Sequence, residues 1–160
     1  MIMTSYTEHP SPLGTLLLAA TEHGISGLYF EQHKYFAGPR DWRRDDGQVH
    51  LRSAARQLDE YFDGRRNAFD LALDLSGTPF QRAVWTALQS LPFGCTVSYQ
   101  AIAQRIARPN AVRAVGTAIG RNPTSIIVPC HRVLGSAGAL SGYAGGLERK
   151  QFLLAHESSA

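Results

Sequence analysis

The first third of the chain carries two short apolar runs of the length of β-strands. Residues 13–20 and 24–30 are separated by Thr21-Glu22-His23-Gly24, which favours a hairpin between two paired strands. The segment 33–47 is charged and irregular, and we expect an exposed loop there. We interpret the histidines of this region as ordinary surface residues: His9, His23, His33 and His50.

A change to helical spacing marks the next element. Apolar positions recur every three or four residues over 49–62, which predicts an amphipathic helix, and Gly64 ends it. Residues 69–75 then alternate apolar and polar side chains, as a half-buried strand does. The order of these elements predicts a small mixed α/β domain over residues 1–75, whose pattern alone reveals no chemistry.

The second half, residues 76–160, carries the signals of several short helices after a linker at Ser76-Gly77. Apolar residues recur at helical spacing over 79–91, and further helices are predicted over 99–107 and 111–119. The caps and first-turn residues are Thr78, Pro79 and Ser98. Only a short turn separates the last two helices, and such a pair is typical of a helix-turn-helix.

Charge adds a second difference between the halves. Residues 1–75 hold eight Lys and Arg and eleven Asp and Glu, whereas residues 76–160 hold eight and two, so the net charges are −3 and +6. No acidic residue lies between Asp74 and Glu148. A basic surface can arise by chance, but carboxylates would repel the phosphates of a polyanion, so their absence favours a nucleic-acid partner.

Composition excludes several other classes of protein. The chain has 160 residues, its apolar runs are too short to span a bilayer, and its first ten residues lack the apolar core of a signal peptide. Two cysteines, Cys95 and Cys130, make no disulfide framework, and no Cys/His cluster has zinc-binding spacing. We expect a cytoplasmic protein in a reducing environment, without a membrane segment or a metal, and we interpret Cys95 as structural.

Pro129-Cys130-His131-Arg132-Val133 is the stretch that carries candidate chemistry. It follows the apolar run 126–128, which predicts a buried strand. A cysteine thiolate is a strong nucleophile, and a neighbouring base or positive charge activates it. The alternative is a cysteine that fills the core beside a solvated histidine and arginine.

Four further motifs accompany this stretch: Tyr99, Ala111-Val112-Arg113-Ala114-Val115-Gly116, Asn122-Pro123 and Gly142-Tyr143. Together they resemble the O6-alkylguanine-DNA alkyltransferases (methylated-DNA–protein-cysteine methyltransferases) over residues 78–157, whereas residues 1–75 resemble that family only in layout. The resemblance implies an α+β fold, with a ribonuclease-H-like α/β supporting domain over 1–75. A mostly helical domain with a winged-helix-like helix-turn-helix follows over 76–160.

The activity that the resemblance implies is single-turnover DNA repair. Cys130 would take the alkyl group from O6-alkylguanine in one in-line displacement and keep it as a thioether, which water does not readily attack. The protein would therefore act once and need no cofactor. Its partner would be alkylated double-stranded DNA, bound in the minor groove by a monomer with no obligate protein partner. Acceptance of O4-alkylthymine stays open.

The resemblance also implies roles around Cys130. His131 would draw the thiol proton through a bound water, since neighbours on a strand point apart. Glu157 would orient His131, in a relay similar in logic to a hydrolase triad. Tyr99 would donate a hydrogen bond to the departing guanine, and Asn122 would hold the turn before the strand. Without the resemblance, Glu157 would be interpreted as an acidic tail residue, Tyr99 as a core tyrosine and Asn122 as a turn asparagine.

The DNA-binding residues follow from the position of the reactive oxygen, which is buried in the base stack until the nucleotide is flipped out. Arg113 would enter the duplex and fill the gap, where an unassigned arginine would contact a phosphate. Ala111, Ala114 and Gly116 would form a contact face small enough for the minor groove. Arg121 is one position later than the arginine of some relatives, so we interpret it as a phosphate contact.

The substrate pocket is expected after the cysteine. Backbone carbonyls of Cys130 and Val133 would hold the exocyclic amine of guanine, and the glycine-rich segment 141–146 would form the wall. Tyr143 would stack on the base, and the amide of Ala144 would lie near the guanine oxygen. Glycines permit such close approach, as they do in any tight loop. The pocket residues are Pro129, Val133, Tyr143, Ala144 and Gly145.

Three other functions remain as alternatives. A non-catalytic alkyltransferase-like damage sensor would flip the same base, but such relatives lack the acceptor cysteine. A helix-turn-helix regulator would leave the Pro-Cys-His-Arg-Val stretch unused. A cysteine hydrolase would need a histidine from elsewhere in the fold.

Overall fold

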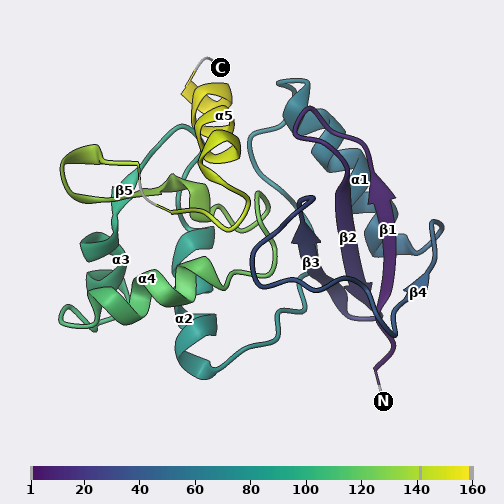
Figure 1. Cartoon of the computed structure of the whole chain (residues 1–160), viewed down its shortest axis with the longest axis horizontal. Coiled ribbons are helices and arrows are strands. Elements are labelled where there is room, and N and C mark those ends of the chain that lie inside the picture. The colour runs from purple at the N-terminus through teal and green to yellow at the C-terminus, as the bar shows by residue number, and fades with distance from the viewer. Residues whose placement is uncertain (1, 141, 159–160) are drawn as a thin grey trace.

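A four-stranded sheet backed by one helix forms the amino-terminal half in the computed structural model, which describes residues 2–140 and 142–158 (Figure 1). The strand order is β3 (Gly24–Tyr29), β2 (Leu16–Thr21), β1 (Ser5–His9) and β4 (Arg43–Arg44). The first three are antiparallel, and β4 runs parallel to β1. The predicted hairpin is therefore confirmed, whereas β1 and β4 were not predicted.

Helix α1 (Val49–Phe62) covers the sheet and confirms the predicted amphipathic helix. It begins where the Gln48 side chain accepts a hydrogen bond from the amide of Leu51, and it is followed by Gly64 at φ +76°. Its buried face packs on the sheet in the first hydrophobic core. That core also takes in Ile126, Ile127 and Leu153 from the second half, together with Leu16, Leu18, Ala20, Ile25, Leu28, Phe30, Leu51, Ala54, Leu58 and Tyr61.

At the outer edge of the sheet, along β3, one prediction is wrong. Residues 69–75 do not form a strand; only Leu73 bridges to Ile25, with hydrogen bonds from Ile25 N to Ala72 O and from Asp74 N to Ile25 O. Further along this edge, Leu28 bridges to Thr124 instead. Two separate segments thus share the edge, which leaves neither enough partners for a ladder.

The segment 33–47 is a second correction, because it is not simply an exposed loop. It contains β4, and His33 is buried, where its Nδ1 accepts a hydrogen bond from the amide of Phe30. Burial, assisted by the positive charge of Arg149, lowers the pKa of His33 to about 4. His33 is therefore a neutral, buried residue and not a surface histidine.

Short helices form the second half, on the left of Figure 1. They begin with α2 (Pro79–Gln89), α3 (Tyr99–Arg105) and α4 (Val112–Gly120), as predicted. Thr78 and Gln81 close a capping box on α2, and the Ser98 hydroxyl caps α3. Helices α3 and α4 pack together on α2, which is the arrangement of a helix-turn-helix.

The remaining elements surround the cysteine. Strands β5 (Val97–Ser98) and β6 (Val133–Leu134) pair in parallel, and β6 follows a 3₁₀ turn, η1 (Cys130–Arg132). A second 3₁₀ turn, η2, covers Ser136–Gly138. The last helix, α5 (Leu147–Ser158), lies between the two halves in Figure 1 and contacts η1.

The apolar run 126–128 is buried, as expected, but it is not a strand. Hydrogen bonds from Val128 N to Thr124 O and from Ile127 N to Ser125 O close it into successive turns. Ile126 has φ +70°, a value that a β-branched residue rarely adopts. Cys130 consequently sits in a 3₁₀ turn and not at the end of an extended strand.

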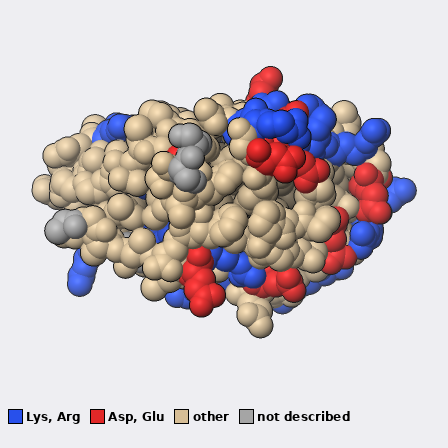
Figure 2. Space-filling view, turned by 90° about the horizontal axis from the view of Figure 1, so that it is seen from above, with Lys and Arg blue, Asp and Glu red and all other residues tan. Residues whose placement is uncertain are grey.

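No helix in the described ranges is long and apolar enough to cross a membrane. On the face seen in Figure 2, acidic and basic atoms both gather mainly over the amino-terminal half, and the surface of the other half is largely uncharged, with a few basic atoms.

Candidate active site

Cys130 lies in the second hydrophobic core, at the start of η1, with only 5% of its surface exposed. Burial raises the pKa of its thiol, and the Asn122 side chain and the Lys150 ammonium act in the opposite direction. The balance leaves the thiol protonated at neutral pH. A base must therefore take its proton before the sulfur can act as a nucleophile.

His131 is completely buried next to Cys130, and its Nε2 lies 2.7 Å from Oε2 of Glu157. Burial lowers the pKa of His131, whereas the bond and charge of Glu157 raise it. Burial alone would raise the pKa of Glu157, but hydrogen bonds from His131 and Arg132 hold it well below its usual range. An ionised carboxylate only accepts hydrogen bonds, so Nε2 carries the proton and Nδ1 is the basic nitrogen.

Two further side chains hold the Glu157 carboxylate. Arg132 donates from Nε to Oε1 at 2.8 Å and from Nη2 to Oε2 at 2.9 Å. Tyr61, on α1 in the amino-terminal half, donates its hydroxyl to Oε2 at 2.7 Å. The sequence places Arg132 within the Pro-Cys-His-Arg-Val stretch, but Tyr61 on the stripe of α1 has the pattern of a core aromatic, and no sequence signal distinguishes it.

Asn122 shapes the backbone before the cysteine. Its Nδ2 donates to Val128 O at 2.9 Å, and its Oδ1 accepts from Thr124 N at 3.0 Å. Asn122 is only 3% exposed, so both hydrogen bonds lie in the interior of the turns formed by residues 122–128. The asparagine thus connects the end of α4 to the segment that carries Cys130.

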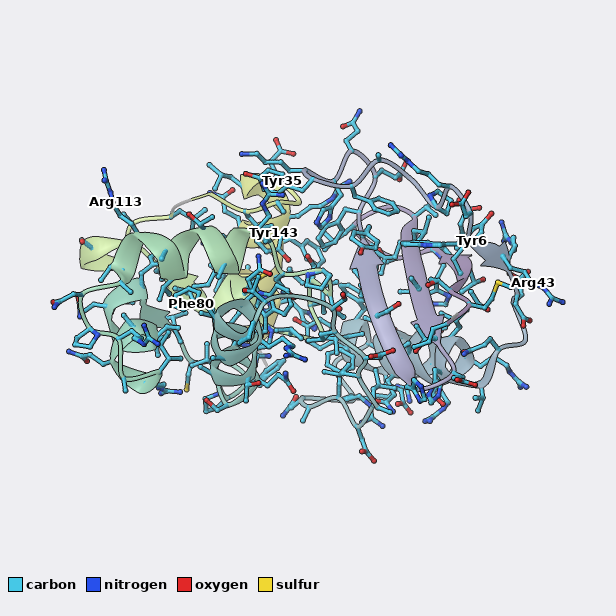
Figure 3. The ribbon with its side chains drawn as sticks, turned by 90° about the horizontal axis from the view of Figure 1, so that it is seen from below. Tyr6, Tyr35, Arg43, Phe80, Arg113 and Tyr143 are labelled. Atoms are coloured by element: carbon cyan, nitrogen blue, oxygen red, sulfur yellow. The ribbon has the colours of Figure 1, made fainter. Side chains whose placement is uncertain are left out.

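A cavity of about 320 Å³ lies where the two halves meet, and it gathers residues that are far apart in the sequence. Its walls include Tyr99, Tyr143 and Ala144, and Figure 3 shows Tyr143 near Tyr35 at this junction. Tyr99 packs close to Gly116, where an added Cβ would lie 3.8 Å from the ring. The remaining lining residues are Lys34, Tyr35, Gly116, Ile119, Gly120 and Gly142. The wall contributed by the amino-terminal half was not predicted.

The other predicted pocket residues do not line this cavity. Val133 is buried, and its carbonyl accepts a hydrogen bond from Lys150 Nζ at 2.9 Å. The carbonyl expected to hold the guanine amine thus already has one donor, a lysine that sequence reasoning missed. Pro129 lines a different cavity of about 350 Å³, with Arg132 among its neighbours. Gly145 packs so closely under the Phe30 ring that a Cβ would not fit. Ser141 of the predicted wall lies outside the described residues.

Helix α4 presents the predicted DNA-binding residues. Arg113 and Ala114 are exposed, and Figure 3 shows Arg113 projecting away from the body of the molecule. Gly116 and Ala111, the residue before the helix, are half-buried. The opposite face is buried through Val115, Ala118 and Ile119. Small side chains thus surround a single long cation.

Arg121 is exposed just after α4, but it already has a neighbour. Its guanidinium lies 3.8 Å from the centre of the Tyr35 ring, a cation–π contact between the two halves. The amide of Lys34 adds a hydrogen bond to Ala144 O at 3.0 Å. The predicted phosphate contact therefore also connects the cavity wall to the helix-turn-helix.

Within residues 2–140 and 142–158, no group of three or more His, Cys, Asp or Glu residues could hold a metal ion. Cys95 is exposed and unpaired with Cys130. The site consists of a buried thiol, an imidazole, a carboxylate and a neighbouring cavity.

Comparison with known proteins gives the same result for both halves. The model of the 6-O-methylguanine DNA methyltransferase ribonuclease-like domain matches residues 2–75, and that of the DNA binding domain of the same family matches residues 79–159. Together these matches cover almost the entire chain.

Curated relatives and solved structures agree with these models. A methylated-DNA–protein-cysteine methyltransferase of Methanosarcina barkeri is 49% identical over 93% of this chain and 94% of its own. One of Mycolicibacterium paratuberculosis is 46% identical, over 97% and 93%. The crystal structure of Mycobacterium tuberculosis OGT in complex with DNA superposes with a TM-score of 0.90 at 44% identity, covering 97% of this chain and 93% of that one.

Proposed function

Because the chain belongs to the 6-O-methylguanine DNA methyltransferase family, we propose that it repairs DNA by transferring the alkyl group of O6-alkylguanine to Cys130. The observation that carries this assignment is the buried contact of 2.7 Å between His131 and Glu157, directly beside the thiol. This arrangement supplies a base next to a nucleophile that cannot ionise unaided.

The proton moves first. Nδ1 of His131 is buried and has no hydrogen-bonding protein partner among the described residues, so it is the nitrogen that can accept the thiol proton through a bound water. The proton on Nε2 stays with His131, held by Glu157. The resulting imidazolium is stabilised by the carboxylate, which remains ionised.

The displacement follows. Cys130 Sγ attacks the alkyl carbon, the bond from that carbon to O6 breaks, and the electron pair leaves with the guanine. A hydrogen bond from Tyr99, at the edge of the cavity, would stabilise the departing base. The product is a thioether, which has no leaving group that water readily displaces. Each chain therefore reacts once, without a cofactor.

DNA approaches through α4 in this proposal. The helix offers Arg113 and Ala114 on its exposed face, and no carboxylate lies between Asp74 and Glu148 to repel phosphates. We propose that α4 enters the minor groove as part of a monomer and that Arg113 occupies the gap left by the flipped nucleotide. Residues 76–160 would carry out the reaction and residues 1–75 would support it. Two free cysteines suit a reducing, cytoplasmic setting.

The test is to mix the protein with a duplex that carries one O6-methylguanine and to weigh the intact protein. We expect a gain of one methyl group that maps to Cys130 and saturates at one per chain. Cys95→Ala should behave like the wild type, whereas Cys130→Ala should gain nothing and still bind the duplex. Lesion-selective binding by the wild type without a gain in mass would instead indicate a non-catalytic damage sensor.

A further inference from the structure

Tyr61 belongs to the amino-terminal half but reaches the end of the proposed relay. Its hydroxyl donates to Glu157 Oε2 at 2.7 Å, and this same oxygen accepts the proton of His131 Nε2 at 2.7 Å. Tyr61 is 0% exposed and Glu157 is 4% exposed, so water does not compete for either bond. The hydroxyl and the imidazole thus share one carboxylate oxygen.

The ring that carries this hydroxyl is firmly held. Phe62, Phe69 and Phe93 lie with their ring centres 5.2 Å, 5.4 Å and 6.2 Å from that of Tyr61. His156, next to Glu157 on α5, contacts the ring and donates from Nε2 to the backbone carbonyl of Tyr61 at 2.7 Å. The end of α1 is therefore attached to α5 at two points, which fixes the position of the hydroxyl.

We propose that Tyr61 is a positioning residue for alkyl transfer, which fixes Glu157 and limits how strongly that carboxylate attracts the proton of His131. The inference rests on the proposed function, because it takes the Glu157–His131 pair as the base of the reaction. It gives the amino-terminal domain a direct part in the chemistry, in addition to its support of the fold.

The expected consequence follows from how the charge of Glu157 is shared. Three donors surround Oε2: Tyr61 Oη, His131 Nε2 and Arg132 Nη2. When one donor is removed, more of the negative charge acts on the remaining two, and the imidazolium becomes more stable. Besides Glu157, the charged groups that act on His131 are Arg132 and Lys150, and both stay unchanged in a Tyr61 variant.

The experiment compares Tyr61→Phe with Tyr6→Phe. The first variant keeps the ring packing and loses only the hydroxyl; the second loses a hydroxyl on β1, at the far end of the amino-terminal domain in Figure 3. Two quantities are measured for both and for the wild type. One is the pH dependence of the single-turnover rate on an O6-methylguanine duplex, and the other is the titration of the His131 ring by NMR.

We expect the acidic limb of the rate profile and the His131 titration both to move to higher pH in Tyr61→Phe, by about half a unit, and neither to move in Tyr6→Phe. An unchanged titration and limb would overturn the proposal, including the case in which Tyr61→Phe merely melts earlier and reacts more slowly at every pH. If the wild type transferred no methyl group at any pH, the proposed function would fail. The His131 titration would still decide whether Tyr61 acts on that ring.

Discussion

The buried relay and the exposed face of α4 hold their functional side chains in opposite ways. The Glu157 carboxylate accepts hydrogen bonds from His131, Arg132, Tyr61 and the amide of Gly94, which lie in three separate parts of the chain. Arg113 on α4, by contrast, projects into solvent. In the proposed function, the chemistry depends on groups fixed by their neighbours, whereas DNA binding depends on a side chain that projects into solvent until the duplex arrives.

The difference follows from what each region must do. A general base acts on a proton that lies within hydrogen-bonding reach, directly or through one water, and burial makes every unpaired charge costly. A helix that enters a groove needs a slim, carboxylate-free surface and one cation of sufficient reach. Changes in the relay should therefore affect stability and rate together, whereas changes on α4 should affect only the reaction in duplex DNA.

The largest effect is expected from Glu157→Gln. The variant leaves Arg132 buried without a counter-charge and leaves His131 without an anion, so we expect unfolding to cost about 3–5 kcal/mol less. Methyl transfer should slow by about 100-fold or more, because the imidazole loses its orientation and basicity. Chemical denaturation and single-turnover rates on an O6-methylguanine duplex measure the two effects.

Glu148→Gln is the matched control, since Glu148 is exposed in the first turn of the same helix. Its stability should stay within about 0.5 kcal/mol of the wild type. Equal stability of the two variants would contradict the view that the carboxylate of Glu157 holds the relay together.

Much of this architecture could be predicted from the sequence where the determinants are local. Thr78 and Ser98 cap helices next to them in the chain, and the apolar stripe of α1 requires no distant partner. Strand β1 was not predicted because only Thr7 of its five residues is buried, so its apolar and polar residues do not alternate clearly. Residues 126–128 were predicted as a strand because an apolar run alone does not distinguish a strand from a buried turn. The turns depend on the side chain of Asn122, which donates a hydrogen bond to the carbonyl of Val128.

The site shows the same limit more strongly. The resemblance to a known family indicated Cys130, His131 and Glu157, but Tyr61 is 96 residues from Glu157 and no local pattern reports their contact. Lys150 likewise has the pattern of a surface residue of α5, although its ammonium is buried against Val133. Contacts of this kind depend on how the two halves dock, which periodicity does not encode.

A pH experiment extends the comparison to two buried histidines. Burial lowers the pKa of both histidines, but Glu157 opposes the shift at His131. At His33 burial and the positive charge of Arg149 act together, and the pKa falls from 6.5 to about 4. The folded protein therefore binds a proton at His33 less readily than the unfolded chain does. The stability contributed by a neutral His33 is complete above pH 6.5 and is lost as the pH falls toward 4, by about 2–3 kcal/mol.

The free energy of unfolding is measured from urea unfolding curves at several pH values between about 7.5 and 4. Free histidine titrates at about pH 6.5 and free aspartate and glutamate at about pH 4, so the upper part of this range reports mainly on histidines. His33→Asn keeps an acceptor for the amide of Phe30 and should reduce the slope of unfolding free energy against pH above pH 5, leaving the part that His131 contributes. His23→Asn, at an exposed histidine, should leave the wild-type slope intact. If the slope of unfolding free energy against pH were the same in the wild type and both variants, His33 would not be the group that makes stability depend on pH.

On α4, Arg113→Ala should change one reaction and spare another. If Arg113 fills the space left by the flipped nucleotide, as proposed, its loss should slow the repair of duplex DNA by about tenfold. Reaction with the free O6-methylguanine base should stay unchanged, since the relay is untouched. Arg82→Ala removes an exposed charge from α2 and is the control for a general loss of positive field. Equal slowing of both substrates by Arg113→Ala would place the residue in the chemistry instead.

The smallest effect, and the sharpest division between the two regions, is expected from Arg121→Ala. If Arg121 contacts a phosphate, duplex affinity should fall by about threefold and the slope of log affinity against log salt by about one. Tyr35→Leu separates this role from the cation–π contact at 3.8 Å, because it removes the ring but leaves the charge. We expect Tyr35→Leu to keep the wild-type salt slope. If instead the two variants lost equal stability and neither changed the salt slope, Arg121 would belong with the contacts that join the two halves of the molecule and not with the free cation of α4.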